Sequence, residues 1–101
     1  MARFQRYMIN PESEVNALRA LGGVKDARVL EIGCGDGRLT YLFAAEARSV
    51  LALDTKAESI EEAKKNLPAD LAGRVRFEVL NALDLDFPPA SFDTALFSLT
   101  L

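Results

Sequence analysis

A short apolar run that ends beside three closely spaced glycines constrains the fold of this chain more than any other feature. Residues 29–32 are Val-Leu-Glu-Ile, and Gly33, Gly35 and Gly37 follow at every second position. Glycine tolerates positive φ and lets a ligand lie directly against the backbone, and a helix that follows such a turn opens with unpaired N–H groups. The pattern predicts a buried parallel strand that passes into a helix around a nucleoside-containing ligand.

The spacing of the glycines separates two classes of nucleotide-binding protein. Dinucleotide enzymes carry G-x-G-x-x-G, in which the last glycine brings the helix close to a pyrophosphate. Arg38 stands where that last glycine would be. Glu31, two residues before the first glycine, would repel a pyrophosphate but attract an ammonium group. The motif therefore favours a cationic ligand and disfavours a nicotinamide-dependent oxidoreductase, which stays an alternative.

With an acidic residue followed by G-x-G-x-G, the chain resembles the class I S-adenosylmethionine-dependent methyltransferases. In that family the acidic residue and the glycine turn hold the methionine part of the cofactor. The resemblance implies this role for Glu31, Gly33, Cys34, Gly35 and Gly37. A tight strand-to-helix turn without a ligand is the alternative interpretation of the glycines taken alone.

A second acidic strand end follows the glycine turn. Residues 50–53 are apolar and lead to Asp54, within reach of the distance of about 20 residues at which a carboxylate binds ribose hydroxyls. The family has an acidic residue here, so the resemblance assigns the ribose to Asp54, with Thr55 beside it. A surface aspartate at a strand end is the alternative. Thr55 and Glu58 also form a predicted capping box at the start of the next helix.

A third polar strand end, Asn81-Ala82, follows the strand predicted at residues 75–80. It is similar to the family segment in which an acidic and a small residue meet the adenine ring. Asn81 replaces the usual acid, and its carboxamide oxygen can accept a hydrogen bond but carries no charge. The alternative is a turn in which Asn81 bonds its own backbone.

Alternating strands and helices predict an α/β fold with a parallel sheet and right-handed crossovers. Strands are predicted at residues 28–32, 49–53, 75–80 and 93–99, and helices at 10–22, 36–46 and 55–67. Leu42 and Ala57 are placed on buried helix faces. By resemblance the strand order is third, second, first, fourth. Residues 1–101 then form one Rossmann-like half domain, a partial doubly wound sheet truncated after the fourth strand. Glu31, Asp54 and Asn81 converge at the carboxyl ends of its strands.

Composition limits the class of protein. Half of the 101 residues are hydrophobic, which suits one small domain, and neither a membrane-spanning run nor a signal peptide is visible. We therefore expect a cytoplasmic protein without a membrane partner. The net charge of −3 disfavours nucleic acid as a partner, and the absence of histidine disfavours a metal site. Cys34, the single cysteine, is expected to fill space and not to act as a nucleophile.

The resemblance implies transfer of the sulfonium methyl group to an acceptor, which we expect to be a small molecule. No catalytic residue can be named, because the family meets its acceptor beyond the fourth strand, where this sequence stops. Tyr7 is a candidate to cover the cofactor, and an ordinary packed aromatic side chain is the alternative. A non-catalytic S-adenosylmethionine-binding or assembly module is the alternative from a different class.

The last residues of the chain predict self-association. The segment at residues 94–101 is apolar, uncharged and free of proline, and as the fourth strand it would be an unprotected sheet edge. Apolar side chains on one face of the sheet would also lie open. We therefore expect a homodimer or larger assembly, formed through the fourth-strand edge or the uncovered sheet face.

Overall fold

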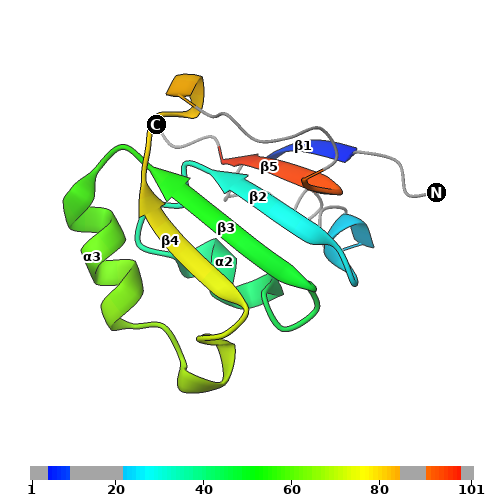
Figure 1. Ribbon diagram of the computed structural model, residues 1–101, viewed down its shortest axis with the longest axis horizontal. Coiled ribbons are helices and arrows are strands. Elements are labelled where there is room, and N and C mark those ends of the chain that lie inside the picture. Colours follow the sequence, from blue (N-terminus) through cyan, green and yellow to red (C-terminus); the bar gives the residue numbers. More distant parts are fainter. Residues whose placement is uncertain (1–4, 10–21, 85–90, 99–101) are drawn as a thin grey trace.

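The computed structural model describes residues 5–9, 22–84 and 91–98 (Figure 1). The strands are β1 (Gln5–Ile9), β2 (Arg28–Ile32), β3 (Ser49–Asp54), β4 (Val75–Val79) and β5 (Thr94–Ser98). The helices are α2 (Arg38–Phe43) and α3 (Ala57–Lys65), and short 3₁₀ turns lie at Ala69–Leu71 and Ala82–Asp84. Most of the helix predicted at residues 10–22 lies outside the described residues. Residues 22–24 are helical, so that helix extends beyond its predicted end at residue 22.

The strands form one sheet with the order β1-β5-β2-β3-β4, and every pairing is parallel. The four predicted strands are β2, β3, β4 and β5 in chain order. Their observed arrangement is therefore third, second, first, fourth, which confirms the predicted Rossmann-like topology. The carboxyl ends of β2, β3 and β4 meet at one edge of the sheet.

Strand β1 was not predicted. Because it is present, the prediction that β5 forms an edge of the sheet is wrong. It pairs with β5 over its whole length, from Gln5 opposite Thr94 to Ile9 opposite Ser98. Figure 1 shows the two strands side by side, although they come from opposite ends of the chain. The N–H and C=O groups of β5 thus have partners on both sides, so β5 is not the sheet edge. Tyr7 lies in β1, opposite Leu96, and its side chain lies outside what the structure describes.

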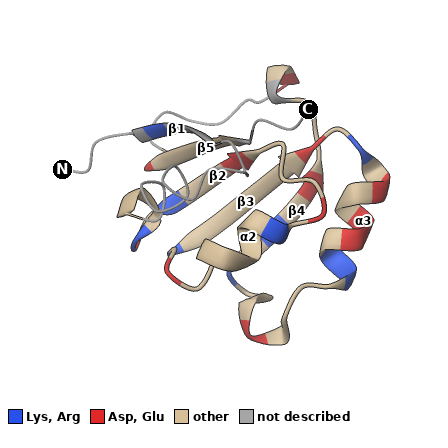
Figure 2. Ribbon diagram, turned by 180° about the vertical axis from the view of Figure 1, so that it is seen from behind, with Lys and Arg blue, Asp and Glu red and all other residues tan. Residues whose placement is uncertain are grey.

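Both described α-helices cover the same face of the sheet, which Figure 2 shows from the helix side. Alternate strand residues point toward this layer, since successive side chains of a strand face opposite ways. The core between the layers includes Val29, Val50, Ala52, Phe77 and Leu96 from the strands and Phe43, Ile60 and Ala63 from the helices. On the opposite face, Leu30, Leu53 and Ala95 are buried, whereas Ile32, Leu51 and Phe97 are half-buried.

The two predicted helices differ from the observed ones in length, in buried residues and in capping. Helix α2 has only six residues, and Thr40 and Phe43 face the sheet, which leaves Leu42 pointing outward with 72% of its surface exposed. Helix α3 begins at Ala57, which is exposed, and its N-cap is Lys56 without a side-chain capping bond. Thr55 and Glu58 therefore do not form the predicted capping box.

An ion pair joins the start of β2 to the residue before β5. Asp93 Oδ2 accepts hydrogen bonds from the backbone N–H of Arg28 (2.9 Å) and from its Nε (3.1 Å), and Oδ1 accepts from Nη2 (2.9 Å). The Asp93 N–H donates in turn to the Arg28 carbonyl (2.8 Å). The hydrogen bonds from Arg28 lower the pKa of Asp93 to about 2 from its ordinary value of 3.8.

We expect Asp93→Asn to lower the melting temperature by a few degrees at pH 7, because the uncharged amide loses the pairing with Arg28. The folded-state pKa lies below the ordinary value, so the stabilisation is present above about pH 4 and disappears as the pH falls toward 2. Thermal unfolding of both proteins at pH 7 and pH 2 measures this. The two melting temperatures should converge at pH 2, and a constant difference would contradict the assignment.

Asp36→Asn is the matched control for this experiment. Asp36 pairs with Arg38 at 3.2 Å, but the Arg38 side chain is 90% exposed, and exposed pairs contribute little to stability. Its melting temperature should follow that of the unchanged protein at both pH values.

Candidate functional site

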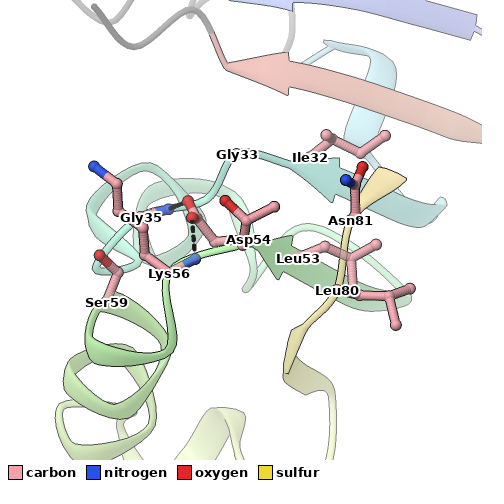
Figure 3. Close-up of a pocket in the computed structure, with 10 residues that line it drawn as sticks. Ile32, Gly33, Gly35, Leu53, Asp54, Lys56, Ser59, Leu80 and Asn81 are labelled. Atoms are coloured by element: carbon pink, nitrogen blue, oxygen red, sulfur yellow. Dashed lines mark hydrogen bonds between the residues drawn. The ribbon is translucent and has the colours of Figure 1, made fainter. Parts of the chain in front are cut away.

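A pocket of about 370 Å³ opens at the carboxyl ends of β2, β3 and β4 (Figure 3). This volume lies within the usual range for small-molecule sites. Ten residues line it: Ile32, Gly33, Gly35, Leu53, Asp54, Thr55, Lys56, Ser59, Leu80 and Asn81. Five of these, Gly33, Gly35, Asp54, Thr55 and Asn81, are residues that the sequence predicted for the cofactor site. The pocket lies at the carboxyl ends of parallel strands, where a nucleotide site is expected in such a sheet.

Asp54, the last residue of β3, lies at the centre of the pocket. Its Oδ2 accepts a hydrogen bond from the N–H of Gly35 (2.9 Å), and its Oδ1 accepts one from the N–H of Lys56 (3.0 Å). Figure 3 marks both bonds. A carboxylate oxygen has two lone-pair directions, so each oxygen keeps one for a ligand. The arrangement suits a ligand with two neighbouring hydroxyl groups.

The glycine turn is fixed to β3 by backbone hydrogen bonds. The N–H groups of Gly33 and Cys34 both donate to the carbonyl of Leu53, at 2.8 and 3.0 Å. Gly35 has φ +57°, and a Cβ there would meet nothing within 4 Å, so the backbone conformation and not space calls for glycine. The open space beside Gly35 lets a ligand approach the main chain.

Gly37 has a different environment from the other two glycines. It is buried and does not line the pocket. A Cβ at this position would lie 3.0 Å from the Tyr41 ring and 3.2 Å from the Phe77 ring. Those two rings pack edge to face, and the Tyr41 hydroxyl donates to the Ala63 carbonyl. Gly37 thus allows α2 to pack closely against β4 and α3.

Glu31 is completely buried and does not line the pocket. Its Oε1 accepts a hydrogen bond from the Thr40 hydroxyl of α2, and Oε2 has no hydrogen-bond partner in the described part of the chain. Burial raises the pKa of this carboxyl group to about 7. The side chain faces the helix layer because it alternates with Leu30 and Ile32 along β2.

Cys34 is buried, and it too lies outside the pocket lining. Burial is the main cause that raises the pKa of its thiol far above the ordinary value. The negative charges of Glu31, Asp54 and Asp36 raise it further. The thiol therefore stays protonated and unreactive at neutral pH, since only a thiolate is a strong nucleophile.

Asn81 lines the pocket and also bonds its own backbone. Its Oδ1 accepts a hydrogen bond from the N–H of Leu83 (3.0 Å), so the turn considered as an alternative is present. Ala82 begins the 3₁₀ turn Ala82–Asp84, and its side chain lies outside what the structure describes.

Sequence reasoning did not find the other half of the lining: Ile32, Leu53, Lys56, Ser59 and Leu80. Ile32 is the last residue of β2, Leu53 is the last but one of β3, and Leu80 directly follows β4. Ser59 stands four residues after Thr55, so the helix predicted at residues 55–67 places both on one face, and this spacing could have identified Ser59.

The described residues contain neither a candidate metal site nor a candidate membrane-spanning helix. Residues 5–9, 22–84 and 91–98 contain no group of three or more His, Cys, Asp or Glu side chains placed to hold a metal ion. No helix within those same residues has the length and apolar character needed to cross a membrane.

Comparisons with known proteins agree on one family. Residues 29–101 match a family model described as a methyltransferase domain. Magnesium-protoporphyrin O-methyltransferase of Rhodobacter capsulatus is 39% identical over 57 residues, which are 56% of this chain and 25% of that protein. The tRNA/tmRNA (uracil-C(5))-methyltransferase of Sulfurimonas denitrificans is 35% identical over 73% of this chain and 23% of its own length. The chain thus spans about a quarter of these relatives.

Solved structures give the same result. An S-adenosylmethionine-dependent methyltransferase from Mesorhizobium loti superimposes with a TM-score of 0.69 at 30% identity, over 82% of this chain and 38% of that one. A Haemonchus contortus phosphoethanolamine N-methyltransferase, solved with phosphoethanolamine and S-adenosylhomocysteine, has a TM-score of 0.69 at 28% identity, over 79% of this chain and 17% of that one.

The buried carboxyl group of Glu31 predicts a pH-dependent stability. The folded state keeps this proton up to about pH 7, whereas an ordinary glutamate loses it near 4.5, so stability should fall as the pH rises between these values. We expect Glu31→Gln to remove that part of the slope and to be at least as stable as the unchanged protein at pH 8. Urea unfolding at pH 5 and pH 8 measures this.

Glu61→Gln is the control, because Glu61 is exposed on α3. It should keep the pH dependence of the unchanged protein. Equal pH slopes for Glu31→Gln and Glu61→Gln would contradict the burial of a protonated Glu31.

Proposed function

This chain belongs to the class I S-adenosylmethionine-dependent methyltransferases, and we propose that its pocket binds S-adenosylmethionine as the cofactor-binding part of a small-molecule methyltransferase. The observation that carries the proposal is the Asp54 carboxylate. Two backbone N–H groups orient it, and each of its oxygens keeps a lone pair for a ribose hydroxyl. Family membership argues against the nicotinamide-dependent alternative.

The remaining residues of the pocket have complementary roles in this proposal. Gly33 and Gly35 let the cofactor approach the backbone, and Thr55 lies beside the ribose. Asn81 meets the base at the end of β4, next to the apolar side chain of Leu80. In this arrangement the polar turn contacts one part of the cofactor, and the apolar wall contacts the base.

Three predicted site residues support the turn in this proposal instead of lining the pocket. Glu31 ties β2 to α2 through Thr40, and Cys34 fills space beside it. Gly37 allows the Tyr41 and Phe77 rings to pack against the start of α2. Glu31 also adds negative charge near the turn whenever it is ionised, which favours a cationic ligand.

The bound cofactor would supply a sulfonium methyl group for transfer to a nucleophile. The protein's part in such a reaction is to hold donor and acceptor in line and to exclude water. The net charge of −3 favours a small acceptor over a nucleic acid, although the relatives include both O-methyltransferases and an RNA methyltransferase.

Asp54→Ala is expected to weaken binding of S-adenosylhomocysteine at least tenfold. The variant loses two hydrogen bonds to a charged group, each worth about 1.5–3 kcal/mol. Isothermal titration calorimetry of the unchanged chain and the variant measures the change. Asp70→Ala, an exposed change in the turn Ala69–Leu71, should bind like the unchanged chain. An unchanged affinity in Asp54→Ala would refute the ribose assignment.

We also propose that the chain forms a homodimer through the sheet face that carries Leu51 and Phe97. Parallel sheets bury both faces, and both described α-helices lie on the other one. The edge of β5 is no longer a route, because β1 occupies it.

Phe97→Lys is expected to dissociate this dimer at ~100 μM, well above the dissociation constant of even a weak ~10 μM complex, because a charge would enter an apolar interface. Analytical ultracentrifugation measures the mass. Leu42→Lys is the control, since Leu42 is exposed on α2, on the helix side of the sheet, and should leave the dimer intact. A monomeric unchanged chain would refute the proposal.

A further inference from the structure

The hydrogen bond from Leu83 to Asn81 fixes which end of the carboxamide faces the ligand. A backbone N–H is a donor, so the side-chain atom that meets it at 3.0 Å is the oxygen Oδ1. The other terminal atom is therefore the NH₂ group. Within the described residues Nδ2 makes no hydrogen bond, and the side chain forms part of the pocket wall.

Figure 3 shows Asn81 together with the apolar end of the pocket. In that view Ile32, Leu53 and Leu80 lie near it, and Gly35, Lys56 and Ser59 lie on the opposite side of Asp54. A nucleoside whose ribose binds Asp54 would place its base at the apolar end. Among the labelled lining residues at that end, Asn81 carries the polar side chain.

Resting on the proposed function, we propose that Asn81 donates a hydrogen bond from Nδ2 to an acceptor on the edge of the purine, so that the pocket accepts both adenine and 6-oxopurine forms of its ligand. Adenine offers its ring nitrogen N7, beside the 6-amino group, as the acceptor. A 6-oxopurine offers the same N7 and, beside it, its carbonyl oxygen. One NH₂ group serves both, whereas a carboxylate at this position could only accept.

The test compares S-adenosylhomocysteine with its deaminated analogue S-inosylhomocysteine, by calorimetry on the full chain. The unchanged chain should bind the two within about fivefold of each other. Asn81→Asp keeps the oxygen that accepts from Leu83 but replaces the donor by a second acceptor. It should bind S-adenosylhomocysteine within about threefold of the unchanged chain, because the carboxylate can instead accept a hydrogen bond from the adenine 6-amino group. It should weaken S-inosylhomocysteine at least tenfold, because N7 and the 6-oxo oxygen are both acceptors that the carboxylate repels.

Two further variants separate the effect of the added negative charge on binding from the effect of losing the hydrogen-bond donor. Asn81→Ser retains an oxygen for the Leu83 N–H without a charge, and it should weaken both ligands by about threefold while keeping their ratio. Asn66→Asp makes the same chemical change at an exposed residue outside the pocket and should change neither affinity. The melting temperature of each variant shows that it is folded.

The outcomes distinguish this inference from the function on which it rests. If the unchanged chain binds S-adenosylhomocysteine but rejects S-inosylhomocysteine more than twentyfold, the role of Asn81 is wrong and the proposed function stands. The same holds if Asn81→Asp leaves the ratio unchanged or Asn81→Ser changes neither affinity. If the folded chain binds neither ligand, the proposed function and this inference both fail.

Discussion

The carboxylate of Asp54 is the interaction on which the site depends. Its two oxygens accept hydrogen bonds from the N–H groups of Gly35 and Lys56, which belong to the glycine turn after β2 and to the start of α3. The Asp54 side chain therefore fixes the glycine turn and the start of α3 relative to each other at the end of β3. Because the same oxygens face the pocket, the group that organises the turn is also the group that a ligand with hydroxyls would meet first.

The two acidic residues near the strand ends show how one residue type takes opposite roles. Asp54 ends its strand and lines the pocket, whereas Glu31 lies one residue before the end of β2 and points into the helix layer. Both residues belong to the face of the sheet that carries Ala52, so their position along the strand decides this difference. Burial raises the pKa of Glu31, and backbone N–H groups satisfy the oxygens of Asp54. The resemblance to the family places both acidic residues at the site, but it does not predict that Glu31 is buried and that Asp54 lines the pocket.

Features set by local pattern could be predicted, and features set by distant contacts could not. The apolar runs at residues 29–32 and 50–53 predict β2 and β3 and a parallel sheet, and the resemblance to the family supplies the order of the strands. β1 could not be predicted, since its position depends on pairing with β5, some 90 residues away. The exposure of Leu42 depends in the same way on where α2 ends, and helix ends are set by the turn and by packing.

A shared turn geometry explains why the residues at the ends of β3 and β4 are suited to a site. Asp54 accepts from the N–H two residues ahead, at Lys56, and Asn81 accepts in the same way from Leu83. Aspartate and asparagine satisfy this turn equally well, because both have an oxygen at the required position. The turn thus fixes the side-chain orientation and leaves the second terminal atom free to differ, an acceptor in Asp54 and a donor in Asn81. At residue 81 an exchange between these two residue types can therefore change what the pocket recognises without changing the backbone, whereas at residue 54 the second oxygen is needed to accept from the Gly35 N–H.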